Sequence, residues 1–159
     1  MRHFWIAFIL ISSLSFAQKA PVKFGKVSEE ELLQTRYDAD TNCHAFYICD
    51  YGYTEFRYAS TMVKSDDAQS QSKGFQVFYE RQFRMKILDK AGINNASFEI
   101  LLRKRGSQLT ETVMDLDAVS YNLENGKIEK SKLKNDGIFK EEYNKYLDLY
   151  KFALPNVKA

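Results

Sequence analysis

The chain has 159 residues, of which 45% are hydrophobic and 14% aromatic, and it carries a formal net charge of +2. This length suits one domain, and the apolar content is high enough to build a core, which excludes a wholly disordered chain. The seven glycines, two prolines and two cysteines exclude collagen-like and disulfide-dense classes. The near-neutral charge argues against a nucleic-acid-binding protein.

The first 17 residues have the features of a secretory signal peptide. Arg2 gives a basic tip, an apolar run follows from Phe4 to Leu14, and Ala17 is a small residue at the expected cleavage site. This run is shorter than the roughly 20 residues that span a bilayer. We therefore expect residues 1–17 to be a signal peptide and residues 18–159 to be a single β-rich domain. The domain is expected in the periplasm or outside the cell, without a membrane span after cleavage.

The first half of this domain is predicted to contain one short helix and three strands. Ser28 and Glu31 form a capping box, which starts a helix that ends near Gln34. Alternating apolar and polar residues then predict strands, and two polar segments predict a turn and a loop. The expected strands are Cys43–Tyr51, Tyr53–Val63 and Phe75–Leu88, the turn is Asp50–Gly52, and the exposed loop is Lys64–Gly74.

The strongest alternation lies in Phe75–Leu88. Arg81 falls on the apolar face of this strand, so we expect a partner, a bend or a sheet edge at that position. The apolar face consists of Phe75, Val77, Tyr79, Phe83, Met85 and Ile87.

The second half is also predicted to be mostly strand. Asn125-Gly126 favours a type I′ hairpin turn, which would place Glu124 opposite Lys127. The charged segment Lys134–Tyr146 is the second place where the pattern allows a short helix. The expected strands are Ala96–Arg103, Val113–Asn122, Lys127–Leu133 and Leu147–Leu154. Short strands with turn signals between them predict a mainly β fold, an antiparallel β-sandwich-like domain with one or two short helices.

The mature chain has one cluster of cysteine and histidine, formed by Cys43, His44 and Cys49. A cysteine hydrolase needs a thiolate within hydrogen-bond reach of an imidazole. Neighbouring residues of a strand point to opposite faces, so Cys43 and His44 pair only if the chain is irregular there. A Cys43–Cys49 disulfide suits an oxidising compartment but requires that segment to be a loop, because a strand would hold the two residues roughly 20 Å apart.

No cofactor or metal site is predicted. One mature histidine and two thiols on the same strand do not make a tetrahedral metal site. Asp38, Asp40 and Asn42 alternate as calcium ligands do, but the glycine and the distant glutamate of a calcium loop are missing, so this segment is expected to be a solvated turn.

Four tyrosines are the candidate ligand-binding residues, and they lie close together in the sequence. Tyrosine side chains on strands can stack against sugars or peptides, although they also pack in cores and across strands. The candidates are Tyr47, Tyr51, Tyr53 and Tyr58.

Three segments together resemble a known family. They are Tyr79–Leu88 (YERQFRMKIL), Ala118–Ile128 (AVSYNLENGKI) and Lys151–Lys158 (KFALPNVK). In this order and spacing they resemble the exported bacterial domain of unknown function that precedes a transglutaminase-like domain. The match runs from about Tyr47 to Ala159. It implies an antiparallel β fold, an extracytoplasmic location and a papain-like Cys-His-Asp domain downstream in full-length members.

The chain departs from this family because it ends at Ala159, where members continue into a further strand and the catalytic domain. No catalytic residue of that domain has a matching position here. We therefore expect the N-terminal portion of a longer architecture, incomplete at its C-terminus, arising from a natural truncation, a split gene or a fragment.

The expected function is that of a noncatalytic extracytoplasmic domain that serves as a scaffold or presents a ligand. The expected partners are a transglutaminase-like domain, a peptide or a cell-envelope glycan. Two alternatives stay open. One is a small cysteine-dependent hydrolase that uses Cys43 or Cys49 with His44. The other is a truncated remnant without independent function.

Overall fold

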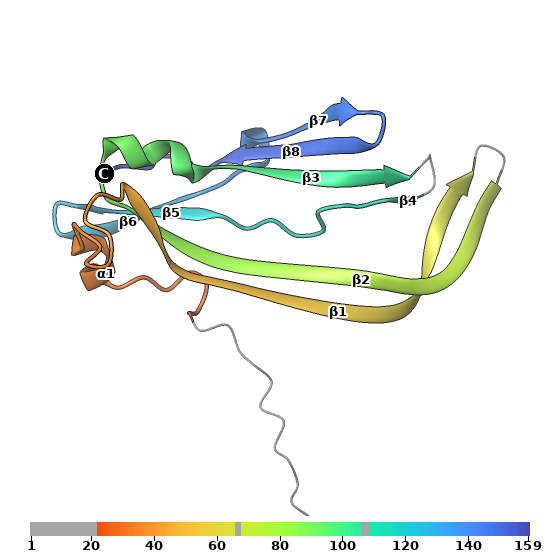
Figure 1. Ribbon diagram of the computed structural model, residues 1–159, viewed down its shortest axis with the longest axis horizontal. Coiled ribbons are helices and arrows are strands. Elements are labelled where there is room, and N and C mark those ends of the chain that lie inside the picture. The colour runs from red at the N-terminus through yellow and green to blue at the C-terminus, as the bar shows by residue number, and fades with distance from the viewer. Residues whose placement is uncertain (1–21, 66–67, 106–108) are drawn as a thin grey trace, which may run out of the picture.

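The computed structural model describes residues 22–65, 68–105 and 109–159 (Figure 1). The fold is mainly β with antiparallel sheets, as predicted. The strands are β1 (Ala45–Ser65), β2 (Ala68–Ile87), β3 (Ser97–Arg105), β4 (Leu109–Thr110), β5 (Val119–Glu124), β6 (Lys127–Lys132), β7 (Ile138–Asn144) and β8 (Leu147–Ala153). The helical segments are α1 (Glu29–Leu33) and two 3-10 turns, η1 (Lys90–Ala96) and η2 (Asn135–Gly137).

The structure bears differently on the predicted signal peptide and on membrane-spanning helices. The predicted signal peptide, residues 1–17, lies outside the described residues. Among the residues that are described, no helix has the length and apolarity needed to cross a membrane.

The longest element is the β1–β2 hairpin, and it differs from the prediction in two places. The expected turn at Asp50–Gly52 is wrong, because β1 runs through it as one strand with a single irregularity between Tyr47 and Cys49. The expected loop at Lys64–Gly74 is also wrong, because both strands extend into it and pair from Ser65 and Ala68 onward. Pairing between the strands satisfies the backbone in both segments and overrides their local turn propensity.

The second sheet has the strand order β4-β3-β8-β7. The charged segment in which a short helix was allowed contains η2 and then β7, which pairs with β8. Pairing with β8 satisfies backbone N–H and C=O groups of β7. In a helix, these groups would have bonded to one another within the segment. The buried apolar side chains that the structure describes lie in or next to β3 and β8: Ala96, Leu102, Leu149 and Phe152.

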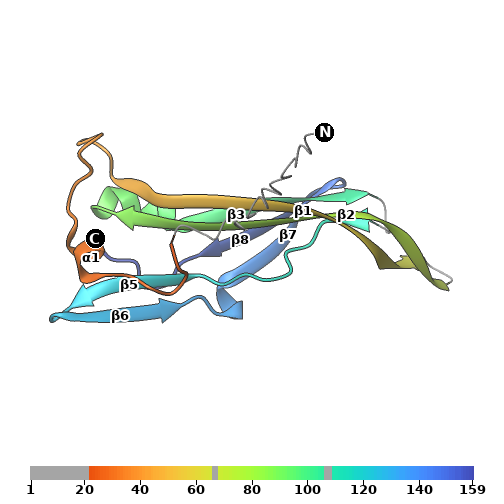
Figure 2. The same ribbon diagram turned by 90° about the horizontal axis from the view of Figure 1, so that it is seen from below.

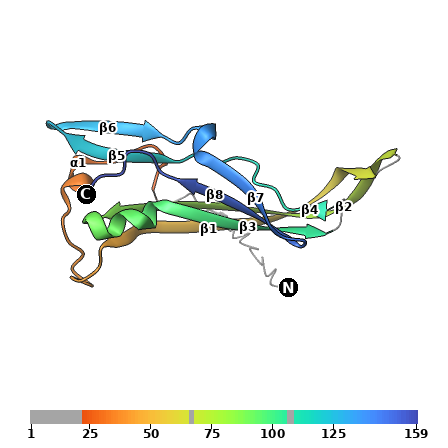
Figure 3. The same ribbon diagram turned by 90° about the horizontal axis from the view of Figure 1, so that it is seen from above.

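The β5–β6 hairpin has the predicted turn. Asn125 and Gly126 both have positive φ, at 50° and 71°, as a type I′ turn requires, and Glu124 lies opposite Lys127. The buried side chains of Ser120 and Asn122 then hold the C-terminal segment, donating to the carbonyls of Pro155 and Asn156. Figure 3 shows α1, one end of β5 and the C-terminus close together.

A row of aromatic rings joins the β1–β2 hairpin to the second sheet. The centroids of Phe83 and Phe98 are 5.1 Å apart, and those of Phe98 and Phe152 are 5.4 Å apart. Figures 1 and 2 show the hairpin running alongside β3 and extending past it at its tip. The rings therefore attach only one end of the hairpin. We call residues 45–51 and 81–87 the root, and residues 52–60 and 73–80 the arm.

Candidate ligand-binding surface

The strand register assigns each hairpin side chain to one of two faces. Residues directly opposite in an antiparallel pair share a face, and every second residue along a strand returns to it. Tyr47 and Tyr58 pair with Met85 and Phe75, so they lie on the face that carries Phe83.

The other two candidate tyrosines lie on the opposite face. Tyr51 and Tyr53 pair with Gln82 and Glu80. The structure thus does not bring the four candidates together on one surface, because one stretch of strand sends its side chains alternately to two faces. Their role in ligand binding stays a prediction.

An uncovered apolar strip lies on the Phe83 face of the arm. The register pairs Phe56 with Val77 and Tyr58 with Phe75, and Tyr79 follows on the same face. These five side chains are between 62% and 80% exposed. We call them the arm strip. The alternation of β2 identified three of them as an apolar face, and Tyr58 was a candidate ligand residue, whereas Phe56 could have been found only by placing β1 and β2 in register.

Contacts within the arm order part of the strip. The rings of Tyr58 and Phe75 meet edge to face, with their centroids 5.2 Å apart. Tyr79 lies over the backbone of Gly52, where an added Cβ would be 3.1 Å from its hydroxyl oxygen. A glycine at that position therefore lets the ring lie flat on β1, which spreads an apolar surface across both strands.

An ion pair marks the boundary between the arm and the root. Arg81 donates two hydrogen bonds to Asp50, at 2.8 Å and 2.6 Å, and its guanidinium lies over the ring of Phe83. These bonds hold the pKa of the Asp50 carboxyl below its usual value and raise that of Arg81. A partner was one of the three explanations, with a bend and a sheet edge, that the sequence suggested for Arg81.

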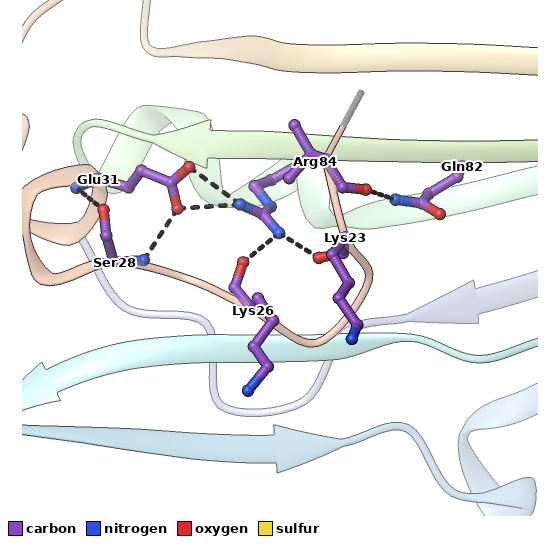
Figure 4. Close-up of polar contacts among 7 residues, drawn as sticks. Lys23, Lys26, Ser28, Glu31, Gln82 and Arg84 are labelled. Carbon is purple, nitrogen blue, oxygen red and sulfur yellow. Dashed lines mark hydrogen bonds and ion pairs between the residues drawn. The ribbon is translucent and has the colours of Figure 1, made fainter. Parts of the chain in front are cut away.

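The opposite face of the root is covered by the N-terminal segment (Figure 4). Arg84 donates to both carboxylate oxygens of Glu31, at 2.9 Å and 3.0 Å, and to the carbonyls of Lys23 and Lys26. Glu31 is also the last member of the predicted capping box with Ser28. The Glu31 carboxylate therefore takes part in both the helix cap and the ion pair with Arg84. Together with the two carbonyl contacts, these bonds hold residues 23–31 against β2.

Two neighbours of Arg84 extend this cover. Gln82 donates to the carbonyl of Val22, and the ammonium of Lys86 donates to the carbonyl of Leu32 at 2.6 Å. Burial lowers the pKa of Lys86. Polar side chains of β2 thus secure the N-terminal segment through its backbone.

The opposite face of the arm is polar. Arg57 pairs with Glu55 at 2.6 Å, and its guanidinium lies 4.4 Å from the ring centroid of Phe78. An ion pair and a cation–π contact thus engage the charged side chains of that face, whereas the five residues of the arm strip include no charged side chain.

The alternative catalytic cluster is partly assembled. His44 Nδ1 lies 2.7 Å from Asp89 Oδ2, and this contact lowers the pKa of Asp89. The other oxygen of Asp89 accepts from the backbone of Ala91 and Gly92 at the start of η1. Asp89 therefore orients the exposed imidazole of His44 beside the root.

The thiols do not complete that cluster. Cys43 and Cys49 are free cysteines and are partly buried. Within the described ranges, neither thiol forms a hydrogen bond to His44, and no group of three His, Cys, Asp or Glu side chains could hold a metal. In the expected solvated turn, Asp40 accepts from the backbone of Asn42 at 3.0 Å.

Comparison of the chain with protein-family models, curated proteins and solved structures gave no match.

Proposed function

We propose that this protein is a noncatalytic extracytoplasmic binding domain and that the arm strip is its binding surface. The observation that supports this most is the exposure of five neighbouring apolar side chains on one face of a regular hairpin. Aromatic residues are enriched in the parts of surfaces that proteins use for binding. In this proposal, the root anchors the hairpin to the rest of the protein, and the arm presents the binding surface.

The size of the strip favours a protein partner over a single sugar. Each aromatic side chain can bury roughly 150–250 Å², so the strip exposes on the order of 700 Å². This is close to the ~800 Å² that one partner contributes to a standard protein interface and exceeds the ordinary apolar patch of a monomer. A transglutaminase-like domain is the partner class that the sequence resemblance suggests, and a cell-envelope glycan is the competing ligand.

The test compares two variants of the exported chain. In the first, Phe56→Ser, Tyr58→Ser and Phe75→Ser remove the strip, and in the control, Tyr53→Ser removes a half-exposed tyrosine from the opposite face. Binding is measured to a transglutaminase-like domain, to peptidoglycan and to soluble glycans. We expect binding to the protein domain, at least tenfold weaker for the triple variant and unchanged for the control. Equal binding by both variants would remove the arm strip from the function.

The cysteine-dependent hydrolase is the second candidate, because His44 is oriented by Asp89. A catalytic thiol would have to approach that imidazole when substrate binds. Hydrolysis of ester or peptide substrates that is abolished by Cys43→Ser or Cys49→Ser would favour it. Thiols that react with iodoacetamide only after unfolding would argue against it. A third possibility, a remnant without function, predicts no cooperative unfolding transition.

A further inference from the structure

We propose that the free edge of β1 in the arm takes up an extended segment of a partner polypeptide as an added β-strand. This inference rests on the proposed function and names the form that the partner takes. Within the described ranges, β1 pairs with β2 and with no other strand. Figure 1 shows β1 along the lower boundary of the molecule, with β2 between it and β4. Such an edge presents outward N–H and C=O groups at every second residue.

Two other edge strands of the molecule, β7 and β6, carry protection that the β1 arm lacks. Strand β7 carries Lys140, Glu141 and Glu142 and has a register shift next to Asn144. Charged side chains and bulges are the usual means of keeping an edge from pairing with another chain. Strand β6 is protected in the same way, with the charged residues Lys127, Glu129, Lys130 and Lys132.

The arm of β1 lacks this protection. Its irregularity lies in the root, between Tyr47 and Cys49, and no proline occurs from residue 52 to residue 60. Its two charges, Glu55 and Arg57, lie on the face away from the strip and pair with each other. On the strip face the edge therefore offers aromatic side chains without a charge to repel an incoming apolar strand.

The edge and the strip together define the chemistry of the occupant. A glycan or a lipid could cover the aromatic rings, but only a polypeptide has donors and acceptors at the ~3.3 Å repeat of a strand edge. Every second side chain of an added strand would lie beside Phe56 and Tyr58 on the strip face. The fitting segment is therefore extended, with uncharged apolar residues at alternate positions, and its addition extends the ~700 Å² strip onto a third strand.

The experiment uses synthetic eight-residue peptides in which valine and tyrosine alternate with threonine and lysine. Two further versions carry N-methyl groups, one on each alternate set of backbone nitrogens. Only one set can face β1, so we expect one version to bind more than tenfold more weakly than the parent and the other to bind comparably. Affinity is measured by fluorescence anisotropy with the full exported chain. Hydrogen exchange of residues 53–60 is expected to slow at least tenfold with the parent peptide.

Side-chain recognition is tested in parallel. The double variant Phe56→Ser/Tyr58→Ser is expected to bind the parent peptide more than tenfold more weakly, whereas Tyr53→Ser on the opposite face is expected to bind as the wild type does. Circular dichroism and the unfolding midpoint of each variant establish that the hairpin is still folded.

Four results would overturn the inference. They are equal binding by both N-methylated peptides, protection on β2 instead of β1, the absence of peptide binding, and a peptide-free dimer in sedimentation that already protects residues 53–60. The last would make a second copy of the chain the occupant. If the backbone methyl groups have no effect while strip variants still lose the protein partner, strand addition fails and the proposed function stands. If strip variants keep the partner, the proposed function itself fails.

Discussion

The root and the arm are parts of one hairpin with one apolar pattern, yet their surroundings differ completely. In the root, Phe83 contacts Tyr47 and Phe98, and the opposite face is closed by the N-terminal segment through Arg84. In the arm, the equivalent face carries Phe75 and Tyr79 in solvent. The same alternation thus gives a half-buried ring in contact with Phe98 in one half and an exposed surface in the other, although β3 runs alongside both (Figure 1).

The largest expected contrast is between two phenylalanines of β2. Phe83→Ala removes ring contacts that join the hairpin to the second sheet, and we expect it to lower the free energy of unfolding by about 3 kcal/mol. Phe75→Ala removes an 80% exposed ring, and we expect a change within about 0.5 kcal/mol. Urea unfolding of both variants checks this. A large loss from Phe75→Ala would mean that the strip is covered in solution.

Two glycines extend the contrast to the backbone. A Cβ at Gly92 would overlap the carbonyl oxygen of His44, whereas one at Gly74 meets nothing within 4 Å. We expect Gly92→Ala to destabilise the fold by about 2 kcal/mol and Gly74→Ala to lie within about 0.5 kcal/mol of the wild type. Thermal unfolding distinguishes them. Equal melting temperatures would show that η1 does not pack tightly on the root.

Substitution of two arginines allows the ion pairs of the root and of the arm to be compared. Arg84→Ala breaks bonds to Glu31 and to two carbonyls, and we expect a loss of about 1.5 kcal/mol with faster tryptic cleavage near Lys23 and Lys26. Arg57→Ala in the arm breaks an exposed pair, and we expect no measurable change in the free energy of unfolding. If cleavage is no faster in Arg84→Ala, the N-terminal segment does not depend on this side chain.

The smallest effect concerns the boundary pair. Because Arg81 lowers the pKa of Asp50 in the folded state, the pair stabilises the fold above the unfolded-state pKa, near 4, and this contribution is lost as pH falls through the folded-state value. Asp50→Asn should therefore lower the urea midpoint at pH 7 and leave it nearly unchanged at pH 2. In an Arg81→Gln background the pH 7 difference should shrink. An equal difference at both pH values would contradict the assignment.

Local sequence signals predicted the elements whose geometry is set by near neighbours. The Ser28–Glu31 cap, the Asn125-Gly126 turn and the alternation of β2 depend on residues a few positions apart, and all three were confirmed. The turn at Asp50–Gly52 was wrong because its competitor, pairing with residues 81–83, lies thirty positions away and leaves no trace in the local pattern.

Sequence reasoning identified only some residues of the arm strip. Tyr58 was named, but it was grouped with Tyr51 and Tyr53, which the register places on the other face. Grouping by closeness in sequence fails on a strand because its side chains alternate. The His44–Asp89 contact was not anticipated either, since it joins residues 45 positions apart.

By itself, the sequence determined that this chain forms antiparallel strands with one apolar face on the hairpin, because period-two patterning and turn chemistry act locally. Only the tertiary structure decided that this face is half-buried at Phe83 and exposed at Phe75. Burial depends on which other strands reach a face. The ring contact of Phe83 comes from Phe98 on β3, and no pattern within β1 or β2 records which residues of a distant strand meet that face.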